Sequence, residues 1–260
     1  MSHVSNLKDV LRAYGDGNLF GEPYGEGPVR VVWLHGWARR GQDFARSATE
    51  LAREGIGSVA LDLPGFGSSP LPTVAGGART YAALLVPALG ELSNEPLVLV
   101  GHSFGGRIAT VIGATNPELV KAIVLTGAPL VRRGDASQAK SPLGYRMVRA
   151  LHARHLVNDQ RMEAARQRYG SSDYRNATGI LRDVLVANVN ESYEPELALV
   201  RAPVFMLWGA NDTEVPLEIA ERAGALIESA HHLRVVAGVG HLLPSEAPHE
   251  LAATVREALA

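Results

Sequence analysis

The 260-residue sequence contains no cysteine, which excludes disulfide bonds, zinc sites with cysteine ligands and a thiol nucleophile. It has no apolar run close to the ~18 residues of a membrane-spanning helix. Residues 1–12 also lack the apolar core of a signal peptide. These absences predict a cytoplasmic protein with no membrane insertion, although an exported protein could equally lack cysteine.

A surplus of charge of either sign is also missing, because 25 Lys and Arg residues face 27 Asp and Glu residues and the formal net charge is −2. Such a balance gives no reason to expect a nucleic-acid partner. The content of 46% hydrophobic and 20% charged residues is that of an ordinary globular protein. No metal-ligand cluster and no cofactor motif is visible, so we expect neither a metal nor a cofactor. The sequence indicates no oligomeric state.

Short apolar segments alternate with helical patterns along most of the chain. Six segments are nearly continuous in hydrophobicity, as parallel strands buried on both faces are, and they are Val29–His35, Ile56–Asp62, Pro96–Gly101, Val120–Thr126, Pro203–Trp208 and Leu233–Ala237. Five helical stretches accompany them, at Asp43–Glu54, Thr80–Leu92, Phe104–Thr115, Leu217–Glu228 and Ala247–Leu259. This alternation predicts an α/β fold with a doubly wound, mostly parallel sheet. One or two weak strands are expected before Val29.

The interval from about residue 130 to residue 200 breaks this alternation. It has no buried-strand pattern but carries helical stretches at Gly144–His155, Gln160–Tyr169 and Ala177–Val189. Structureless loops of this length are rare in compact domains. We therefore expect a helical insertion that covers one face of the sheet.

The strongest local signal is the segment from Gly101 to Gly105, which has the pattern G-x-S-x-G between a predicted strand and a predicted helix. Small residues allow a tight turn that lifts the hydroxyl of Ser103 above the sheet. The same turn places it at a helix N-terminus, where free N–H groups favour negative charge. We interpret Ser103 as the catalytic nucleophile. The alternative is a glycine-rich turn with a bystander serine.

A serine nucleophile needs a base, and the base needs an acid that orients it. Asp212 and His241 each follow a predicted strand, so both lie at the carboxyl edge of the sheet, where ligands gather. Of the four histidines after Asp212, only His241 occupies a loop just past a strand. We predict His241 as general base and Asp212 as the orienting acid. The alternatives are a helix cap or turn residue for Asp212 and a surface loop histidine for His241.

An oxyanion hole requires two backbone N–H donors. The residue after the nucleophile, Phe104, is one candidate, and Trp37 in the loop after the first core strand is the other. The indole of Trp37 is also a candidate wall of an acyl pocket. For His35, in the same loop, we favour a structural hydrogen bond over a catalytic role.

Five segments resemble successive signatures of the α/β-hydrolase superfamily, in its serine-triad branch with a helical cap: VVWLHGW, LDLPGFGSS, LVGHSFGG, WGANDTEVP and GVGHLLPSEAP. The resemblance implies the α/β-hydrolase fold, with a core domain of residues 1–130 and 200–260. It implies a helical cap, residues 131–199, inserted after the sixth strand. It also implies that Trp37 supplies an oxyanion amide and that Asp212 is the triad acid. The turn Asp62–Gly67 is interpreted as structural.

The predicted triad suits a serine carboxylesterase, which cleaves a carboxylic ester or thioester through an acyl-enzyme on Ser103. The same triad also serves C–C bond hydrolases and lyases, and some ligand receptors of this fold retain it, so these alternatives stay open. Arg107 is similar to a residue of a lyase from menaquinone biosynthesis, but we favour a helix-surface or structural ion-pair role for it.

The predicted cap is basic. Residues 131–182 contain 11 Lys and Arg against four Asp and Glu, a balance of +7, which leaves −9 for the rest of the chain. This charge indicates either solvated helix faces or a surface for an anionic substrate. Together with the LHGW and LDLPGFG segments, it resembles the pimeloyl-carrier-protein methyl esterases. The expected partners are therefore small-molecule esters or acyl carriers.

Overall fold

The computed structural model describes residues 11–132, 143–169 and 172–260. Eight strands form one sheet in the order β1-β2-β4-β3-β5-β6-β7-β8. They are β1 (Arg12–Tyr14), β2 (Leu19–Tyr24), β3 (Val29–Leu34), β4 (Gly57–Asp62), β5 (Leu97–His102), β6 (Val120–Thr126), β7 (Val204–Gly209) and β8 (His231–Val236). Only the β1–β2 and β2–β4 pairs are antiparallel. The mostly parallel sheet predicted from the sequence is confirmed.

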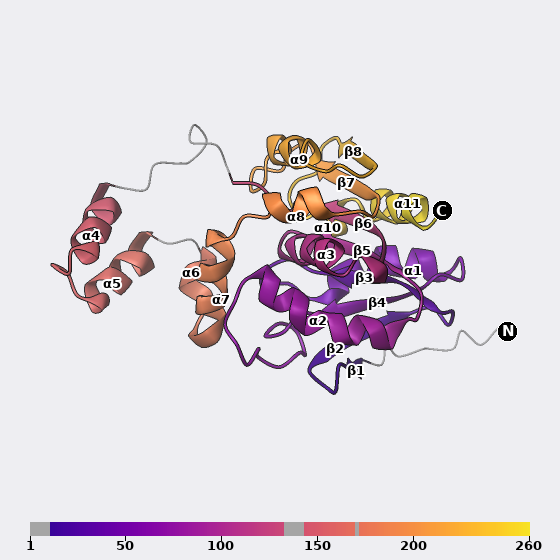
Figure 1. The fold of residues 1–260 in the computed structure, drawn as a ribbon, viewed down its shortest axis with the longest axis horizontal. Coiled ribbons are helices and arrows are strands. Elements are labelled where there is room, and N and C mark those ends of the chain that lie inside the picture. The colour runs from indigo at the N-terminus through magenta and orange to yellow at the C-terminus, as the bar shows by residue number, and fades with distance from the viewer. Residues whose placement is uncertain (1–10, 133–142, 170–171) are drawn as a thin grey trace.

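Helices pack against both faces of this sheet (Figure 1). The hydrophobic cluster on one face includes residues of α2 (Ala78–Leu92), α3 (Phe104–Thr115) and α9 (Leu217–Gly224), and the cluster on the other face includes residues of α1 (Ala45–Ala52) and α11 (Pro248–Leu259). Shorter helical segments connect these elements: η1 (Gly41–Phe44), η2 (Pro117–Leu119), α8 (Glu194–Leu199) and α10 (Leu243–Glu246). The sheet is therefore doubly wound.

The alternation of side chains along β3 shows why the core strands are apolar throughout. Val32 and Leu34 belong to the cluster that contains α2 and α3, whereas Val31 and Trp33 belong to the cluster that contains α1 and α11. All four side chains are fully buried. Because successive side chains of a strand point to opposite faces, a strand covered on both faces needs an apolar residue at every position.

The last strand, β8, differs from the prediction of a strand buried on both faces. Leu233 and Val235 are 37% and 43% exposed, because β8 is the edge strand and pairs only with β7. The strand begins at His231, two residues earlier than predicted, since polar residues are tolerated at an exposed edge. His231 and His232 therefore lie within the strand, at its amino end.

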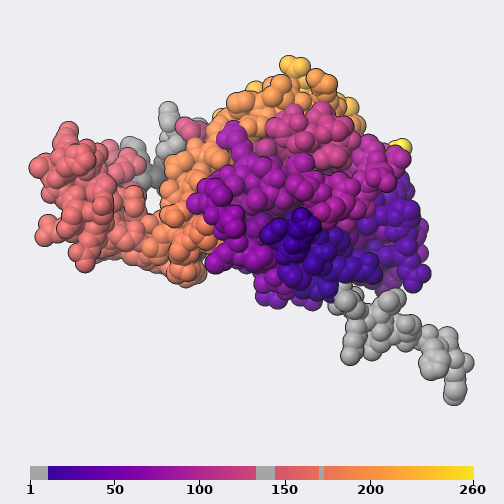
Figure 2. All heavy atoms as spheres, turned by 60° about the horizontal axis from the view of Figure 1, so that its bottom comes forward, coloured from indigo at the N-terminus to yellow at the C-terminus, as the bar shows by residue number. Residues whose placement is uncertain are grey.

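In the described part of the predicted insertion, four helices follow β6: α4 (Leu143–Ala153), α5 (Asp159–Tyr169), α6 (Ser172–Asn176) and α7 (Gly179–Asn190). Figures 1 and 2 show α4 and α5 standing out from the body of the molecule, with α6 and α7 between them and the helices of the core. The helical character predicted for this interval is confirmed, whereas α8, which leads back to β7, was not predicted.

The two ends of the insertion meet at one point of the core. Tyr193 N–H donates a hydrogen bond to Leu130 O at 3.1 Å. The guanidinium of Arg107 donates to Pro129 O at 3.1 Å and to Asn188 O at 2.9 Å. Arg107 thus joins α3 to the end of α7 through backbone carbonyls, which is the structural role favoured for it, although the predicted ion pair is replaced by carbonyl acceptors.

Candidate active site

Ser103 occupies the turn between β5 and α3. Its backbone has φ 50° and ψ −109°, a combination that costs a non-glycine residue about 1–3 kcal/mol and is concentrated at functional sites. The turn is held because Ser103 N–H donates to Thr126 O at 2.9 Å on the neighbouring strand β6. The side chain is partly exposed, at the N-terminus of α3. The position of the serine therefore matches the turn predicted from G-x-S-x-G.

The three glycines around Ser103 lie where neighbouring atoms leave no room for a side chain. A Cβ atom at Gly101 would lie 2.5 Å from Gly106 Cα, and one at Gly105 would lie 2.0 Å from Leu34 O. A Cβ atom at Gly106 would lie 2.5 Å from Ala128 Cβ. Since real Cβ atoms do not approach so closely, any side chain here would push α3 away from β3 or β6.

The structure brings Asp212 and His241 together at the carboxyl edge of the sheet. His241 Nδ1–H donates to Asp212 Oδ2 at 2.9 Å. The other carboxylate oxygen, Asp212 Oδ1, accepts the N–H groups of Glu214 at 3.0 Å and Val215 at 2.8 Å. The carboxylate is buried and fixed on both oxygens, so it can hold the imidazole in one orientation. Gly127 adjoins this pair, because a Cβ atom there would lie 2.9 Å from His241 Nδ1.

The electrostatic surroundings of His241 favour its protonated form. Burial lowers the pKa of the imidazole, but the hydrogen bond and charge of Asp212, with smaller contributions from Glu214 and Glu246, raise it above the ordinary value of 6.5. Glu214 Oε2 is 3.6 Å from His241 Nε2. Among the described residues, no hydrogen bond joins Ser103 Oγ to His241 Nε2, as is common before substrate binds.

Sequence reasoning missed Glu214, Glu246 and His102 as neighbours of the base. Glu246 Oε2 accepts Gly240 N–H at 2.6 Å and so holds the loop that carries His241. The ring centroid of His102 is 4.9 Å from that of His241. Burial, with the charge of His241, lowers the pKa of His102 to about 3, so His102 stays neutral. Glu214 had one available signal, its place two residues after Asp212 in the same loop.

The two predicted oxyanion donors have free amides. The loop after β3 makes a turn in which Arg39 N–H donates to Gly36 O at 3.2 Å, with Ala38 at φ 54°. In such a turn the N–H of Trp37 stays outside the closing hydrogen bond. No hydrogen bond among the described residues uses the amide of Trp37 or of Phe104. The indole of Trp37 packs edge-on against Phe104, with ring centroids 5.9 Å apart, so the two residues are neighbours.

His35 and Asp62 hold the loops around this turn. His35 Nε2 accepts Leu63 N–H at 2.9 Å, which leaves its Nδ1–H to donate to Gly36 O at 2.7 Å. Burial lowers the pKa of His35 to about 4, consistent with this neutral ring. Asp62 accepts the N–H groups of Gly41 and Ser68, both at 2.8 Å. Both side chains thus have the structural roles expected for them.

A cavity of about 340 Å³ adjoins the oxyanion turn, between the loops after β3 and β4 and helices α6 and α7. Its wall includes the apolar side chains of Trp37, Phe66 and Leu181. Arg39 and Arg40 also line it, and Arg39 Nε is 2.6 Å from Asp43 Oδ2. Asp173 lies on the same border, so this cavity has an apolar wall and a border with charges of both signs next to one predicted oxyanion amide.

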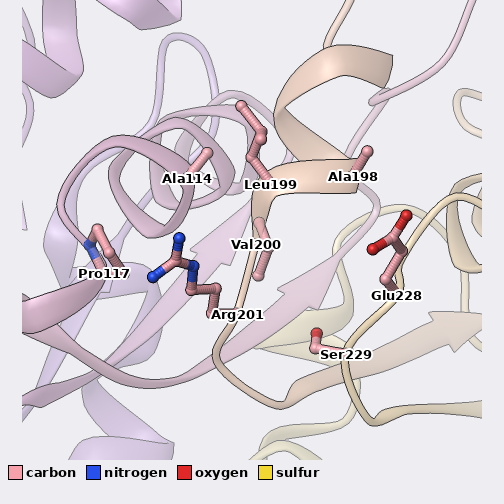
Figure 3. Close-up of a pocket in the computed structure, with 8 residues that line it drawn as sticks. All are labelled: Ala114, Pro117, Ala198, Leu199, Val200, Arg201, Glu228 and Ser229. Carbon is pink, nitrogen blue, oxygen red and sulfur yellow. The ribbon is translucent and has the colours of Figure 1, made fainter.

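A larger cavity, of about 530 Å³, lies elsewhere (Figure 3). It is lined by Ala114, Pro117, Ala198, Leu199, Val200, Arg201, Glu228 and Ser229, and Figure 3 shows the side chains of Arg201 and Glu228 on opposite sides of Val200. Ala114 lies near the end of α3, whose N-terminus follows Ser103. At 1.5 Å per residue the helix separates the two by roughly 16 Å. The larger cavity therefore cannot hold atoms that react at Ser103.

The described residues contain no group of three or more His, Asp or Glu side chains arranged to hold a metal ion. No helix within residues 11–132, 143–169 and 172–260 is both long enough and apolar enough to cross a membrane.

The family described as alpha/beta hydrolase fold matches residues 29–248. The chain is 32% identical over 220 residues to a pimeloyl-[acyl-carrier protein] methyl ester esterase of Chromobacterium violaceum, over 77% of this chain and 82% of that protein. It is 26% identical over 265 residues to the uncharacterized hydrolase YugF of Bacillus subtilis, over 93% and 94% of the two chains.

A solved structure gives the same result for the fold. An esterase from Exiguobacterium antarcticum superposes with a TM-score of 0.72 at 22% identity, over 96% of this chain and 99% of that one. Because the family match spans most of the eight-stranded sheet and the turn that carries Ser103, we conclude that the chain belongs to the α/β-hydrolase family and is a hydrolase of that fold.

Proposed function

We propose that the chain is a serine hydrolase that cleaves carboxylic esters through an acyl-enzyme on Ser103. The observation that carries the proposal is the 2.9 Å hydrogen bond between Asp212 and His241, at the same sheet edge as the strained serine turn. An imidazole oriented by a buried carboxylate beside a helix-terminal serine is the arrangement that acyl transfer needs.

In the proposed reaction, His241 Nε2 takes the proton of Ser103 Oγ as the oxygen attacks the ester carbonyl. The carbonyl oxygen becomes an oxyanion, which the free amides of Trp37 and Phe104 stabilise by hydrogen bonding. The partial positive charge at the N-terminus of α3 adds to this stabilisation. The intermediate then expels the alcohol, which takes the proton from His241, and water hydrolyses the acyl-enzyme by the same steps.

Covalent labelling tests this function. A fluorophosphonate probe should label the wild-type protein at Ser103, as located by mass spectrometry of the peptides. Ser103→Ala should abolish labelling and lower turnover of p-nitrophenyl acetate by about 10⁴-fold, because triad residues act as a unit. Ser229→Ala, in the larger cavity, is the matched control and should label like wild type. Labelling that survives Ser103→Ala would assign the nucleophile to another residue.

The same proposal divides the chain into a core of residues 1–130 and 200–260 and a cap of residues 131–199. Arg146, Arg149 and Arg154 of the cap are exposed and form no ion pair with other described residues. Arg132 differs, because its guanidinium donates to Asn190 O at 3.1 Å. Arg133 lies outside the described residues.

A second candidate function is hydrolysis of an ester whose acyl group is borne on an acyl carrier. The 32% identity to the methyl ester esterase of C. violaceum favours it, as do the exposed arginines of α4, which suit a large anionic partner. Small substrates would not reach these arginines, since Figure 1 shows α4 far from the sheet. C–C bond hydrolysis by the same three residues and ligand binding without turnover are the remaining alternatives. Turnover of short p-nitrophenyl esters would separate an enzyme from a receptor.

A further inference from the structure

Glu214 lies on the opposite side of the imidazole from Asp212. Asp212 Oδ2 is 2.9 Å from His241 Nδ1, whereas Glu214 Oε2 is 3.6 Å from His241 Nε2. The side chain of Glu214 is 71% exposed and that of His241 is 11% exposed. A carboxylate therefore stands between the solvent and the nitrogen that exchanges protons in the proposed reaction.

The loop fixes the backbone of Glu214 in this position. Its N–H group donates to Asp212 Oδ1, and the next residue, Val215, donates to the same oxygen. Val215 O in turn accepts Trp208 Nε1–H at 2.8 Å, and Trp208 is fully buried in β7. The backbone of Glu214 is thus anchored to the sheet, so its side chain starts from a fixed position beside the imidazole.

The leaving group of an ester must approach the same nitrogen. As the tetrahedral intermediate collapses to the acyl-enzyme, His241 Nε2 gives its proton to the departing alcohol oxygen, which requires that oxygen within hydrogen-bond distance of Nε2. Substituents of the alcohol then lie within a few ångströms of Glu214. At such distances a carboxylate attracts a cationic substituent and repels an anionic one.

We propose, on the basis of the function proposed above, that Glu214 determines specificity by favouring esters whose alcohol carries a positive charge. The other charges that act on His241 are those of Asp212 and of Glu246 in α10, and both are acidic. The imidazole of His102, from β5, is neutral. The cations Arg39 and Arg40 instead line the cavity beside Trp37. The leaving-group side of His241 is therefore acidic.

An isosteric pair of esters tests this selection. Acetylcholine and 3,3-dimethylbutyl acetate are acetate esters whose alcohols have the same shape, but only the choline alcohol carries a positive charge. The ratio of their kcat/KM values should fall by about three- to tenfold in Glu214→Gln, the range expected for one charge pair at the edge of solvent. The ratio in wild type should also fall with added salt. Glu218→Gln is the matched control, because Glu218 is an exposed glutamate in α9 that pairs with Arg222.

The pH profile gives a second readout. Removing a carboxylate next to Nε2 removes a charge that favours the imidazolium, so the acid limb of kcat/KM for the neutral ester should move to lower pH by roughly half a unit. An unchanged choline ratio, with Ser103-dependent hydrolysis intact, overturns the role of Glu214 and leaves the proposed function standing. Turnover of both esters that persists in Ser103→Ala overturns the two proposals together.

Discussion

Asp212→Asn tests whether one carboxylate selects the tautomer of His241. Asp212 Oδ1 accepts two backbone N–H groups, from Glu214 and Val215. In the asparagine variant the amide oxygen must keep that position, because an NH₂ group there would face two donors. The NH₂ group is then directed at His241 Nδ1, which becomes an acceptor. The proton of the imidazole moves to Nε2, and Nε2 can no longer take a proton from Ser103.

The expected loss follows from this change of tautomer. We expect kcat to fall by up to ~10⁴-fold, equivalent to about 5 kcal/mol of transition-state stabilisation. The melting temperature should change little, since the backbone hydrogen bonds to Oδ1 are kept. The assay is kcat for p-nitrophenyl acetate, with ¹⁵N chemical shifts of the His241 ring to identify the tautomer.

Asp16→Asn is the matched control, because Asp16 lies in the β1–β2 turn with φ 54°, a conformation that asparagine also adopts. It should retain wild-type turnover. Activity of Asp212→Asn within tenfold of wild type, with the tautomer changed, would refute the argument that Asp212 sets the protonation of the base. An unchanged tautomer would instead show that the N–H groups of Glu214 and Val215 do not dictate the orientation of the new side-chain amide at position 212.

Three further predictions concern the base, the cap and the turn. Because Asp212, Glu214 and Glu246 raise the pKa of His241, kcat/KM should rise with pH through a midpoint above 6.5 and then plateau, and a profile that is flat from pH 6 to 8 would contradict the assignment. Reversing charge in Arg146→Glu plus Arg149→Glu should lower kcat/KM for esters borne on an acidic acyl carrier in a salt-dependent way, whereas equal effects on p-nitrophenyl acetate would mean that these arginines only solvate a helix. Gly105→Ala should lower the free energy of unfolding by roughly 3 kcal/mol, or the melting temperature by about 6–12 °C, because its Cβ would meet Leu34 O at 2.0 Å. Gly90→Ala in α2, with nothing within 4 Å of the new Cβ, is its control and should be neutral or stabilising.

The positions of Ser103, Asp212 and His241 could be predicted because each follows a strand that an apolar run marks in the sequence. A continuous apolar run locates a strand end to within a residue or two, and parallel strands bring such ends to one edge. The structure places Asp212 and His241 in hydrogen-bond contact there, while their catalytic roles stay predictions. β6 and α3 have the predicted bounds, since their runs are long and sharply terminated.

Features that depend on side-chain placement could not be predicted. The approach of Glu214 to His241 depends on the path of one loop. Loops lack the hydrophobic periodicity from which helices and strands are predicted. The exposure of β8 depends on its place at the edge of the sheet, because its apolar residues at 233 and 235 resemble those of a central strand. The carbonyl acceptors of Arg107 come from Pro129 and Asn188, which are distant in sequence and carry no signal in their side chains.

The contact between Leu130 and Tyr193, where the insertion leaves and re-enters the core, bears on protein engineering. Tyr193 N–H bonds to Leu130 O, so the chain leaves β6 and returns toward β7 at one place on the core, and the paired residues of β6 and β7 lie outside the insertion. The insertion also contacts the core elsewhere, for example where Arg107 donates to Asn188 O, so a segment grafted in its place must keep such contacts as well. Helices from another member of the family could be grafted between Leu130 and Tyr193. Such a graft would change the substrate specificity while Ser103, Asp212 and His241 keep their positions at the sheet edge.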